Sequence, residues 1–470
     1  MKKLIQEPVK LFVIIFCSLV VSCHNVHYPE PDKDEIILRH ERHIQHYKEH
    51  LPAILSLKEA QKIALINNPD PQIAKKRIEQ AMAKFSQASA ALYPKLDFNF
   101  DITHIQDSSS RGLPFVSPEN YELYSPALQF SWLIYDGLNR KYQILAADYR
   151  LASAKQHQIN SERILLNLIS QNFYTAALQL ELIKIAEEDA SFNDKQAKDV
   201  QKKMDEGMSG REELLNFKLR FNDAQVELLN AQQQYKIQLI VLAELMGLSD
   251  ASALKKTKLD IAIDQTLLKR GFNFDKSLEQ ANERADLKAL FLEIQAAHAQ
   301  LKAGNSLYRP KLSSSIQYGY SRLDDLNFHK NDREFQGGLN LNIPIYNKSR
   351  KYQIEELKSI IAELELQYVK ERNAISSQLK QKITSLEIIR KKLESLTVSL
   401  ALSSEIRDIE LKKYQVGKAS ITRLNEVQTA LVKAQSRLRL EQVRVLLIIE
   451  DILSETGENW HKIHHEMKKK

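Results

Sequence analysis

One cysteine of this sequence stands where covalent chemistry is expected. Three lysines precede an apolar run over residues 11–21, and Val20, Val21, Ser22 and Cys23 follow in that order. A run of this length is too short to span a bilayer but suits a signal-peptide core. A hydrophobic residue, a small residue and then Cys is the bacterial lipoprotein processing pattern, in which the thiol takes the acyl chains. We therefore predict a signal peptide over 1–22 and lipidation of Cys23, the alternative being an ordinary signal peptide.

Histidines form the next group that could do chemistry. Six of the 13 histidines lie within residues 24–50, and four of these have the spacing of one helix face: His40, His43, His46 and His50. Imidazoles on one face suit a copper or silver ion. A His-rich linker is the interpretation that we favour, and the same holds for His461, His464 and His465. We therefore expect no metal site.

Several classes of chemistry are excluded. Two cysteines cannot form a disulfide scaffold or a multi-cysteine zinc site. The sequence contains no HExxH motif, no P-loop lysine motif, no G-x-S-x-G elbow and no G-x-G-x-x-G motif. The net charge of +7 is modest for 470 residues, and no Lys/Arg cluster is interleaved with aromatic residues. We expect neither an enzyme nor a cofactor, and no nucleic-acid partner.

The scarcity of helix breakers indicates what positions these residues. The chain has only 12 Gly and 12 Pro, and four long stretches contain neither: 138–206, 211–246, 345–416 and 418–456. Such stretches predict helices, the first on the order of 100 Å long at the usual rise per residue. Gly207 and Gly417 separate a long helix from a shorter one. Each glycine therefore predicts the bend of a helical hairpin.

The two hairpins belong to an internal repeat. Gly207 and Gly417 are 210 residues apart, and so are Gly247 and Gly457. The stretch 134–144 resembles 345–354 at nearly the same offset. The sequence thus predicts two tandem copies, 56–250 and 275–457, joined by a linker over 251–274. Residues 23–55 form an N-terminal extension and 458–470 a polar tail.

Four segments between the helices alternate with the period of a strand. They lie at about 95–104, 127–135, 311–321 and 336–345. Alternation is typical of a soluble sheet with one buried face, and equally of a transmembrane barrel strand. Tyr and Trp near the strand ends favour the barrel. Because four strands cannot close a barrel and open edges cannot lie in lipid, the barrel interpretation requires oligomerisation.

The order of these elements carries a family resemblance. The motifs that carry it are Ser56 to Ala60 with Asn67 to Pro69, Ala90 to Pro94, Ile134 to Gly137, Ile343 to Asn347, Arg284 to Leu287 and Tyr414 to Ser420. In this order, and duplicated, they resemble the TolC-type outer-membrane efflux protein family over essentially the whole mature chain. The lipoprotein pattern resembles the subgroup that serves resistance-nodulation-division pumps. Arg284 to Leu287 departs from the family's Arg-Pro-Asp-Leu, with Ala285 in place of proline.

This resemblance implies a mainly α fold with a small transmembrane β part. Long coiled-coil hairpins in two tandem repeats would form a periplasmic tunnel, and four strands per chain would contribute to a 12-stranded barrel of a homotrimer. The chain would lie in the bacterial outer membrane with a large periplasmic part, anchored at Cys23. The hairpin tips, about 203–213 and 413–426, would face a periplasmic adaptor and an inner-membrane transporter. Such a channel passively conducts drugs or metal ions.

The resemblance also places a periplasmic gate at the tips. Family members carry acidic residues after the second tip glycine, which select cations as a ring. The matching positions in this sequence fall near Arg423, Asn425 and Glu426. Glu212 and Glu213 lie at similar positions in the first tip. Arg423 is a departure that weakens the expected negative ring. The candidate adaptor contacts are Gly207, Ser209, Gly417 and Ser420.

Two other functions are also compatible with the sequence. A conduit of a type I protein secretion system would have the same architecture. A lipid-tethered periplasmic coiled-coil protein with a soluble sheet belongs to a different class. A passive duct carries little substrate specificity, so the sequence does not name the cargo.

Overall fold

The computed structural model describes residues 32–38, 51–106, 120–248, 252, 254, 257–260 and 265–467. The predicted lipidation site Cys23 and the histidines between residues 24 and 50 lie outside these ranges. The chain divides into two compact units, each assembled from three segments. Unit 1 comprises Met1–Ile36, Glu79–Ala152 and Leu292–Glu365, and unit 2 comprises Ile37–Ile78, Ser153–Phe291 and Leu366–Lys470. Each unit therefore takes residues from both sequence repeats.

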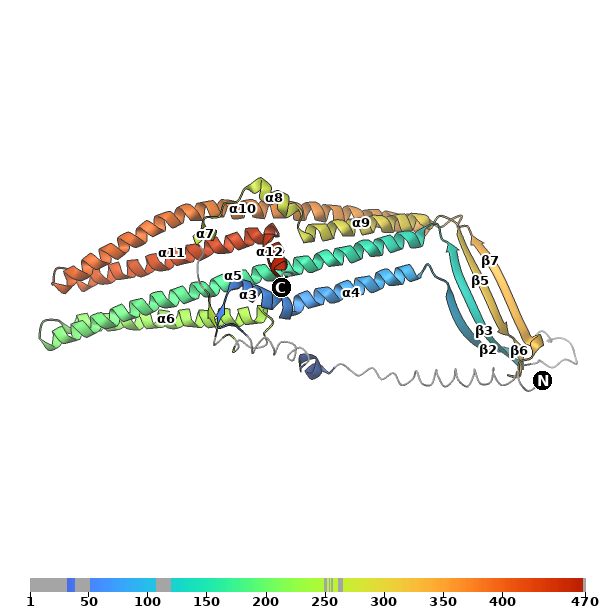
Figure 1. The fold of residues 1–470 in the computed structure, drawn as a ribbon, viewed down its shortest axis with the longest axis horizontal. Helices are drawn as coiled ribbons and strands as arrows, with labels where there is room; N and C mark the ends of the chain where they lie inside the picture. The colour runs from blue at the N-terminus through green and yellow to red at the C-terminus, as the bar shows by residue number, and fades with distance from the viewer. Residues whose placement is uncertain are drawn as a thin grey trace. The chain divides into compact units, whose positions relative to one another are not determined.

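Unit 1 contains an antiparallel sheet with two strands from each repeat (Figure 1). Its long strands are β2 (Lys95–Gln106), β3 (Asn120–Tyr135), β5 (Lys311–Tyr320) and β7 (Arg333–Asn342). They pair in the order β2-β3-β5-β7, and the short β6 (Arg322–Leu323) pairs with β3 beside the 3₁₀ turn Lys330–Asp332. Among the described residues, β2 and β7 are edge strands that do not pair with each other.

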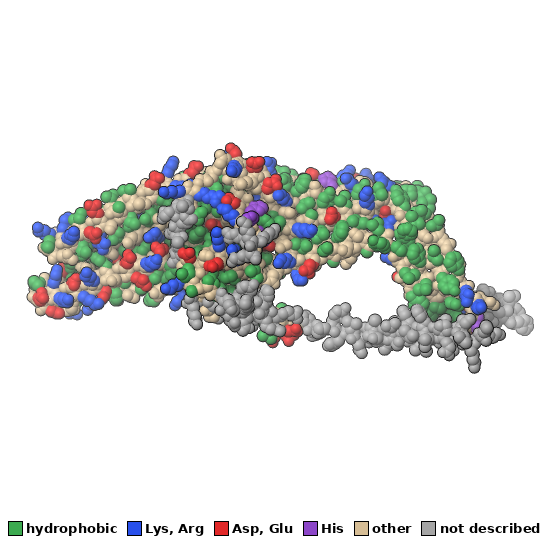
Figure 2. Space-filling view, in the orientation of Figure 1, with side chains coloured by type: hydrophobic (Ala, Val, Ile, Leu, Met, Phe, Trp, Pro, Cys, Tyr) green, Lys and Arg blue, Asp and Glu red, His purple; other side chains and the backbone are tan. Residues whose placement is uncertain are grey.

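The register gives the sheet one apolar and one polar face. Directly opposite residues share a face. Phe98, Leu128, Tyr318 and Phe335 lie opposite one another across the four strands, and so do the neighbouring residues Asp97, Gln129, Gln317 and Gln336. Much of the apolar face is exposed, with Phe335 at 73%, and Figure 2 shows hydrophobic side chains gathered over the strands. The alternation in the sequence therefore separates two chemically different surfaces.

The strands end where the sequence removes their hydrogen bonds or their alternation. β7 stops at Asn342, three residues before the predicted end, because Pro344 has no backbone N–H to donate. β3 begins at Asn120, seven residues before the predicted start, in a stretch without clean alternation. Gly319 permits a close approach there, since a Cβ at this position would lie 2.4 Å from the Pro126 carbonyl oxygen.

Four helices contribute residues to both units. They are α4 (Pro69–Ala90), α5 (Asn139–Asp205), α9 (Ala285–Ser306) and α10 (Lys348–Gln415). The remaining elements lie in unit 2: α3 (Leu57–Asn67), α6 (Arg211–Leu245), α7 (Gln265–Leu268), α8 (Phe274–Asn282), α11 (Ile421–Glu455), α12 (Glu458–Met467) and the two-residue strands β1 (Ile54–Leu55) and β4 (Lys258–Leu259). Among the described residues, no helix has both the length and the apolar character needed to cross a bilayer.

Each hairpin of unit 2 has its own apolar core. Ile169 and Phe173 of α5 pack with Leu242 of α6 in the first hairpin. Leu379 and Leu386 of α10 pack with residues of α11 in the second. A third cluster, described below, contains residues of both hairpins. The two repeats therefore fold with equivalent cores and meet through separate contacts.

The C-terminal helix α12 is held to α5 by a buried carboxylate. Trp460 Nε1 donates to Glu162 Oε2 at 2.8 Å, and His464 Nε2 lies 2.8 Å from the same oxygen. Burial raises the pKa of Glu162, but the hydrogen bonds from His464 and Trp460 outweigh it, so the pKa lies below its ordinary value. Nearby, Glu450 accepts from Ser170 Oγ at 3.1 Å, and burial raises its pKa. Polar groups therefore fix this part of unit 2.

Candidate functional site: the two hairpin tips

The first hairpin turns at a glycine. The N–H of Gly207 donates to the Met204 carbonyl at 2.9 Å, and the N–H of Met208 donates to the Lys203 carbonyl at 2.7 Å. These bonds close α5 with Gly207 in the left-handed region at φ 71, where a residue without Cβ is favoured. Gly210 then begins α6 without a side-chain cap, while Ser209 Oγ donates to Glu213 at 2.6 Å.

The second hairpin repeats this backbone with a different cap. Gly417 adopts φ 74 and donates to the Tyr414 carbonyl at 3.0 Å, and Lys418 donates to the Lys413 carbonyl at 2.8 Å. Ser420 caps α11 by accepting from the Arg423 N–H at 3.2 Å. Gly207 and Gly417 therefore form the bends, whereas Ser209 and Ser420 stabilise the starts of the returning helices.

The two tips contact each other through an apolar cluster. Phe217 of α6 and Tyr414 of α10 meet edge to face, with ring centroids 5.9 Å apart. Leu214, Leu424 and Val427 belong to the same cluster. Tyr414 is only 7% exposed, and Phe217 is fully buried. The aromatic pair therefore couples the two repeats next to their bends.

A polar contact reinforces this pair. The Tyr414 hydroxyl hydrogen-bonds to the Glu213 carboxylate at the start of α6. Burial raises the pKa of Tyr414 from 10.0 to about 12, and the negative charge and hydrogen bond of Glu213 add to the shift. The phenol therefore stays protonated and keeps its donor for the carboxylate. Glu213 is half-buried, whereas Glu212 beside it is exposed.

Asn425 joins the hairpins rather than facing solvent. It is 4% exposed, and its Nδ2 donates to Asn216 Oδ1 of α6 at 2.7 Å. One helical turn further along α11, Gln428 Nε2 donates to Asp189 Oδ1 of α5 at 2.7 Å. α11 is thus tied to both helices of the first hairpin by side-chain amides.

Arg423 and Glu426 form an ion pair on the surface of α11. Arg423 Nη1 lies 3.2 Å from Glu426 Oε2, and the two side chains are 54% and 60% exposed. An exposed pair of this kind contributes little stability, but it places a positive charge beside the carboxylate. The structure therefore brings together two of the predicted gate residues with opposite charges.

The side chains that connect the tips were not all evident from the sequence. Tyr414 lies in the sequence motif of the second tip, but its partner Glu213 is 201 positions away. Asn216 and Phe217 read as ordinary helix residues, since helical periodicity shows which face is buried and not against which segment.

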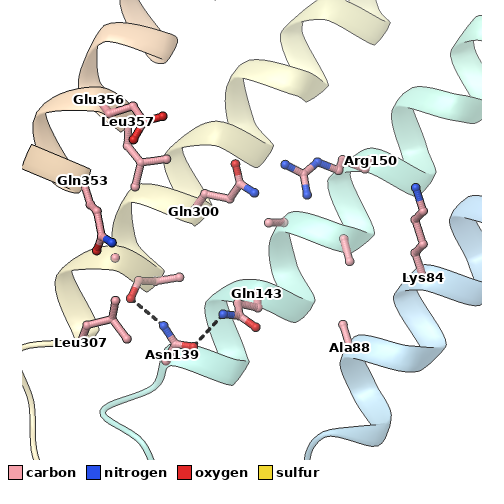
Figure 3. Close-up of a pocket in the computed structure, with 14 residues that line it drawn as sticks. Lys84, Ala88, Asn139, Gln143, Arg150, Gln300, Leu307, Gln353, Glu356 and Leu357 are labelled. Atoms are coloured by element: carbon pink, nitrogen blue, oxygen red, sulfur yellow. Dashed lines mark hydrogen bonds between the residues drawn. The ribbon is translucent and has the colours of Figure 1, made fainter. Parts of the chain in front are cut away.

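Unit 1 contains a separate hollow at the start of α5 (Figure 3). Its volume is about 580 Å³, and residues of α4, α5, α9 and α10 line it, among them Lys84 and Arg150. On its floor, Asn139 Nδ2 donates to the Ala303 carbonyl at 2.8 Å, and Gln143 Nε2 donates to Asn139 Oδ1 at 2.8 Å. The amides fix α5 to α9, and the hollow has a polar wall.

The described residues bring no metal-binding cluster together. No group of three His, Cys, Asp or Glu side chains is arranged to hold an ion in the part of the chain that the structure covers. His464 contacts Glu162 and Trp460 instead. The site at the tips is therefore built from hydrogen bonds, one ion pair and apolar packing.

One helical hairpin from each repeat, together with a sheet that takes two long strands from each repeat, defines a class of channel protein. The chain belongs to the outer membrane efflux protein family, which it matches over residues 61–248 and 278–446. The predicted family, its mainly helical fold and the kinship with outer membrane efflux channels are thereby confirmed. No curated protein sequence gives a match.

Solved structures share this fold at low sequence identity. VceC from Vibrio cholerae is 17% identical with a TM-score of 0.75, and the match covers 85% of this chain and 96% of VceC. The Campylobacter jejuni CmeC outer membrane channel is 16% identical with a TM-score of 0.74, covering 85% of each chain. The open state of the Neisseria gonorrhoeae MtrE outer membrane channel is 14% identical with a TM-score of 0.71, covering 85% and 88%.

Proposed function

We propose that three copies of this chain form an outer-membrane efflux conduit, and that their sheets close into one barrel of 12 strands. The observation that carries the proposal is the open sheet. Within the described residues, β2 and β7 are edge strands, and one face carries exposed large apolar side chains. Unpaired backbone groups are unstable in lipid, whereas an exposed apolar face is unstable in water. Pairing β2 of one copy with β7 of the next satisfies the backbone groups, and lipid then covers the apolar face.

The polar face of the sheet then lines the channel. The row of Asp97, Gln129, Gln317 and Gln336 lies on that face and would recur three times around the barrel. Such a lining carries hydrated solutes without a dedicated binding pocket. The conduit is passive, and an inner-membrane pump supplies the energy.

The hairpin tips act as the periplasmic gate in this proposal. Tyr414–Glu213 and Asn425–Asn216 hold the second hairpin against the first. Opening requires these contacts to be exchanged for others, which an adaptor protein bound at the tips would provide. Ser209 and Ser420 lie beside the bends and are the proposed adaptor contacts.

Lipidation at Cys23 completes the proposed arrangement. A diacylated and amide-acylated cysteine gives stable anchoring, since each buried methylene contributes about 0.8 kcal/mol. The cargo would be drugs or metal ions delivered by a resistance-nodulation-division transporter through a periplasmic adaptor. A type I secretion conduit is the alternative.

Reconstitution in planar bilayers tests the conduit. We expect discrete single-channel conductance and migration on gels that changes on heating. Absence of both would favour the lipid-tethered coiled-coil protein instead.

Cysteine pairs test the barrel separately. One cysteine is placed on β2, starting at Asn99, and one on β7, starting at Asn340, and the pair is stepped along both strands. We expect oxidised ladders of dimer and trimer for the matching register. The pair Asp97→Cys/Gln129→Cys, whose positions are directly opposite within one chain, is the control for an intrachain disulfide. Only monomer at every register would refute strand pairing between copies.

Gene deletion identifies the cargo class. Efflux predicts increased susceptibility to drugs or metal ions with secreted polypeptides unchanged. Loss of a secreted polypeptide with unchanged susceptibility would identify a type I secretion conduit. Crosslinking from the 413–426 tip would identify the adaptor and the pump.

A further inference from the structure

A groove in unit 2 runs between the two hairpins and is lined by residues of both. Its volume is about 760 Å³, and it is lined by α5 and α6 of the first hairpin and by α11 of the second. It extends away from the tips, beginning at Asn425 and continuing past Gln428. A volume of this size is typical of a site for a small organic molecule.

Gln428 provides an acceptor that has no partner in the described part of the chain. The residue is 7% exposed, and its Oε1 is buried without a hydrogen bond. Its orientation is set by Asp189, because Nε2 donates to Asp189 Oδ1 at 2.7 Å and the reverse orientation would place two oxygens together. A buried amide oxygen left unpaired costs free energy that a donor from a ligand would recover.

Asp189 adds a negative charge at the same place. Burial raises its pKa, and hydrogen bonds from Gln428 and Asn193 and the charge of Arg220 lower it in part. Arg220 and Lys433 also line the groove, but among the described residues neither forms an ion pair with this carboxylate. A cation brought into the groove would therefore meet a carboxylate whose charge is only partly balanced.

The groove also has apolar lining residues. Ile185 and Ala186 of α5 and Ala224 of α6 line it and are buried. A bare metal ion gains nothing from such a wall, and the described residues hold no cluster of three metal-ligand side chains. An organic cation, by contrast, fits both parts.

We propose that this groove binds an organic ammonium ion. The charged nitrogen donates to the Asp189 carboxylate and to Gln428 Oε1, and the hydrocarbon part packs on Ile185 and Ala224. Charge-assisted hydrogen bonds of this kind are short and strong. Binding of an ammonium ion in this groove does not require that the protein conduct. A negative result in the channel experiments above would therefore not contradict this proposal.

Benzylamine is a suitable probe, with benzyl alcohol as its neutral control. Binding to the purified full-length protein is measured by titration calorimetry and by ligand-observed NMR. We expect benzylamine to bind and benzyl alcohol to bind about tenfold more weakly or worse. Asp189→Asn, which keeps the side-chain size, is expected to weaken benzylamine binding about tenfold or more. Gln428→Met, which removes the acceptor at similar volume, is expected to weaken it several-fold.

The matched control is Asp194→Asn on the same helix. Asp194 is exposed, pairs with Lys198 at 2.6 Å and does not line the groove. We expect wild-type benzylamine binding for this variant. Circular dichroism and the oligomeric state establish that each variant is folded. Equal benzylamine affinity of wild type and Asp189→Asn, equal affinity for the alcohol, or no binding to the wild type would each overturn the proposal.

Discussion

Removing one hydroxyl group from each chain should loosen the gate. Tyr414→Phe deletes the donor to Glu213 and keeps the ring against Phe217. The ring also keeps its contact with the Lys203 ammonium group, 5.7 Å from its centroid. The substitution therefore isolates the polar contact between the hairpins from their apolar packing.

The size of the effect follows from the burial of the pair. A hydrogen bond to a charged group contributes about 1.5–3 kcal/mol. Glu213 is half-buried and also accepts from Ser209 at 2.6 Å, so we expect a value near or just below the low end of this range, about 1–2 kcal/mol per chain. That corresponds to about a 5–30-fold larger population with the tips apart.

Open probability in planar bilayers measures this population. We expect Tyr414→Phe channels to open more often at unchanged single-channel conductance. Tyr235→Phe is the matched control, because Tyr235 is a half-buried tyrosine on α6 that packs in the first hairpin core. Glu213→Gln should resemble Tyr414→Phe, and the double variant should add little to either. Wild-type open probability in Tyr414→Phe would refute the restraint.

Alkaline pH should act on the same contact. The folded pKa of Tyr414, about 12, is higher than the ordinary value of 10.0. The contact therefore contributes its full stability below pH 10 and loses it as the pH rises towards 12. The absorbance difference between wild type and Tyr414→Phe near 295 nm reports this titration. A midpoint near 10, unaffected by Glu213→Gln, would contradict the assigned contact.

Three further predictions concern other parts of the chain. Gly417→Ala places a Cβ on a residue in the left-handed region and should destabilise the second tip by about 1–2 kcal/mol. Faster hydrogen exchange at the second tip would measure this. Gly271→Ala is the control, because Gly271 lies in open space at ordinary φ, and hydrogen exchange should not change. Because the pKa of Glu162 is lowered, the docking of α12 is fully stable above pH 4.5, the ordinary value, and is lost as the pH falls through the lowered pKa. The fluorescence of Trp460, in a variant whose other tryptophan Trp132 is replaced, should report this loss. Glu162→Gln should abolish the transition. Cys23→Ser should prevent incorporation of labelled palmitate, and the chain should no longer be sorted to the membrane as a lipoprotein. Labelling that persists would exclude Cys23 as the lipidation site.

The helices were predictable because their signals are local. Gly and Pro are absent over whole helix lengths, and the bends at Gly207 and Gly417 require positive φ. The strand ends were less predictable. Alternation marks the middle of a strand, whereas its ends depend on the partner strand, as β3 shows where Asn120 pairs with Gln106.

The side-chain contacts between the hairpins depend on tertiary structure. Asn425 reads as a polar residue of an exposed helix, and the family resemblance placed it beside Glu426 at a gate. The structure buries it against Asn216, because α11 packs on α6 as well as on α10. A contact across 209 positions leaves no signature in one sequence, so burial of this amide was not predictable.

The two tips share a backbone but have diverged in side-chain chemistry, and this divergence bears on the gate. Glu213 and Asn216 of the first hairpin contact Tyr414 and Asn425 of the second. Their counterparts 210 residues later, Arg423 and Glu426, pair with each other at the surface.

The contact between the hairpins is therefore one-sided: the first hairpin supplies the acceptors and the second supplies the donors. Breaking Tyr414–Glu213 and Asn425–Asn216 weakens the contact at the tips, whereas the apolar cluster and Gln428–Asp189 still join the hairpins. The surface pair of Arg423 and Glu426 can stay intact. It follows that the carboxylate of Glu426 is balanced by Arg423 as long as that pair holds. A negative ring at this tip would then depend on exposed Glu212 or on the release of Arg423. Arg423→Gln should consequently increase cation selectivity without the rise in open probability expected for Tyr414→Phe, and a variant in which both change together would contradict this separation of charge from closure.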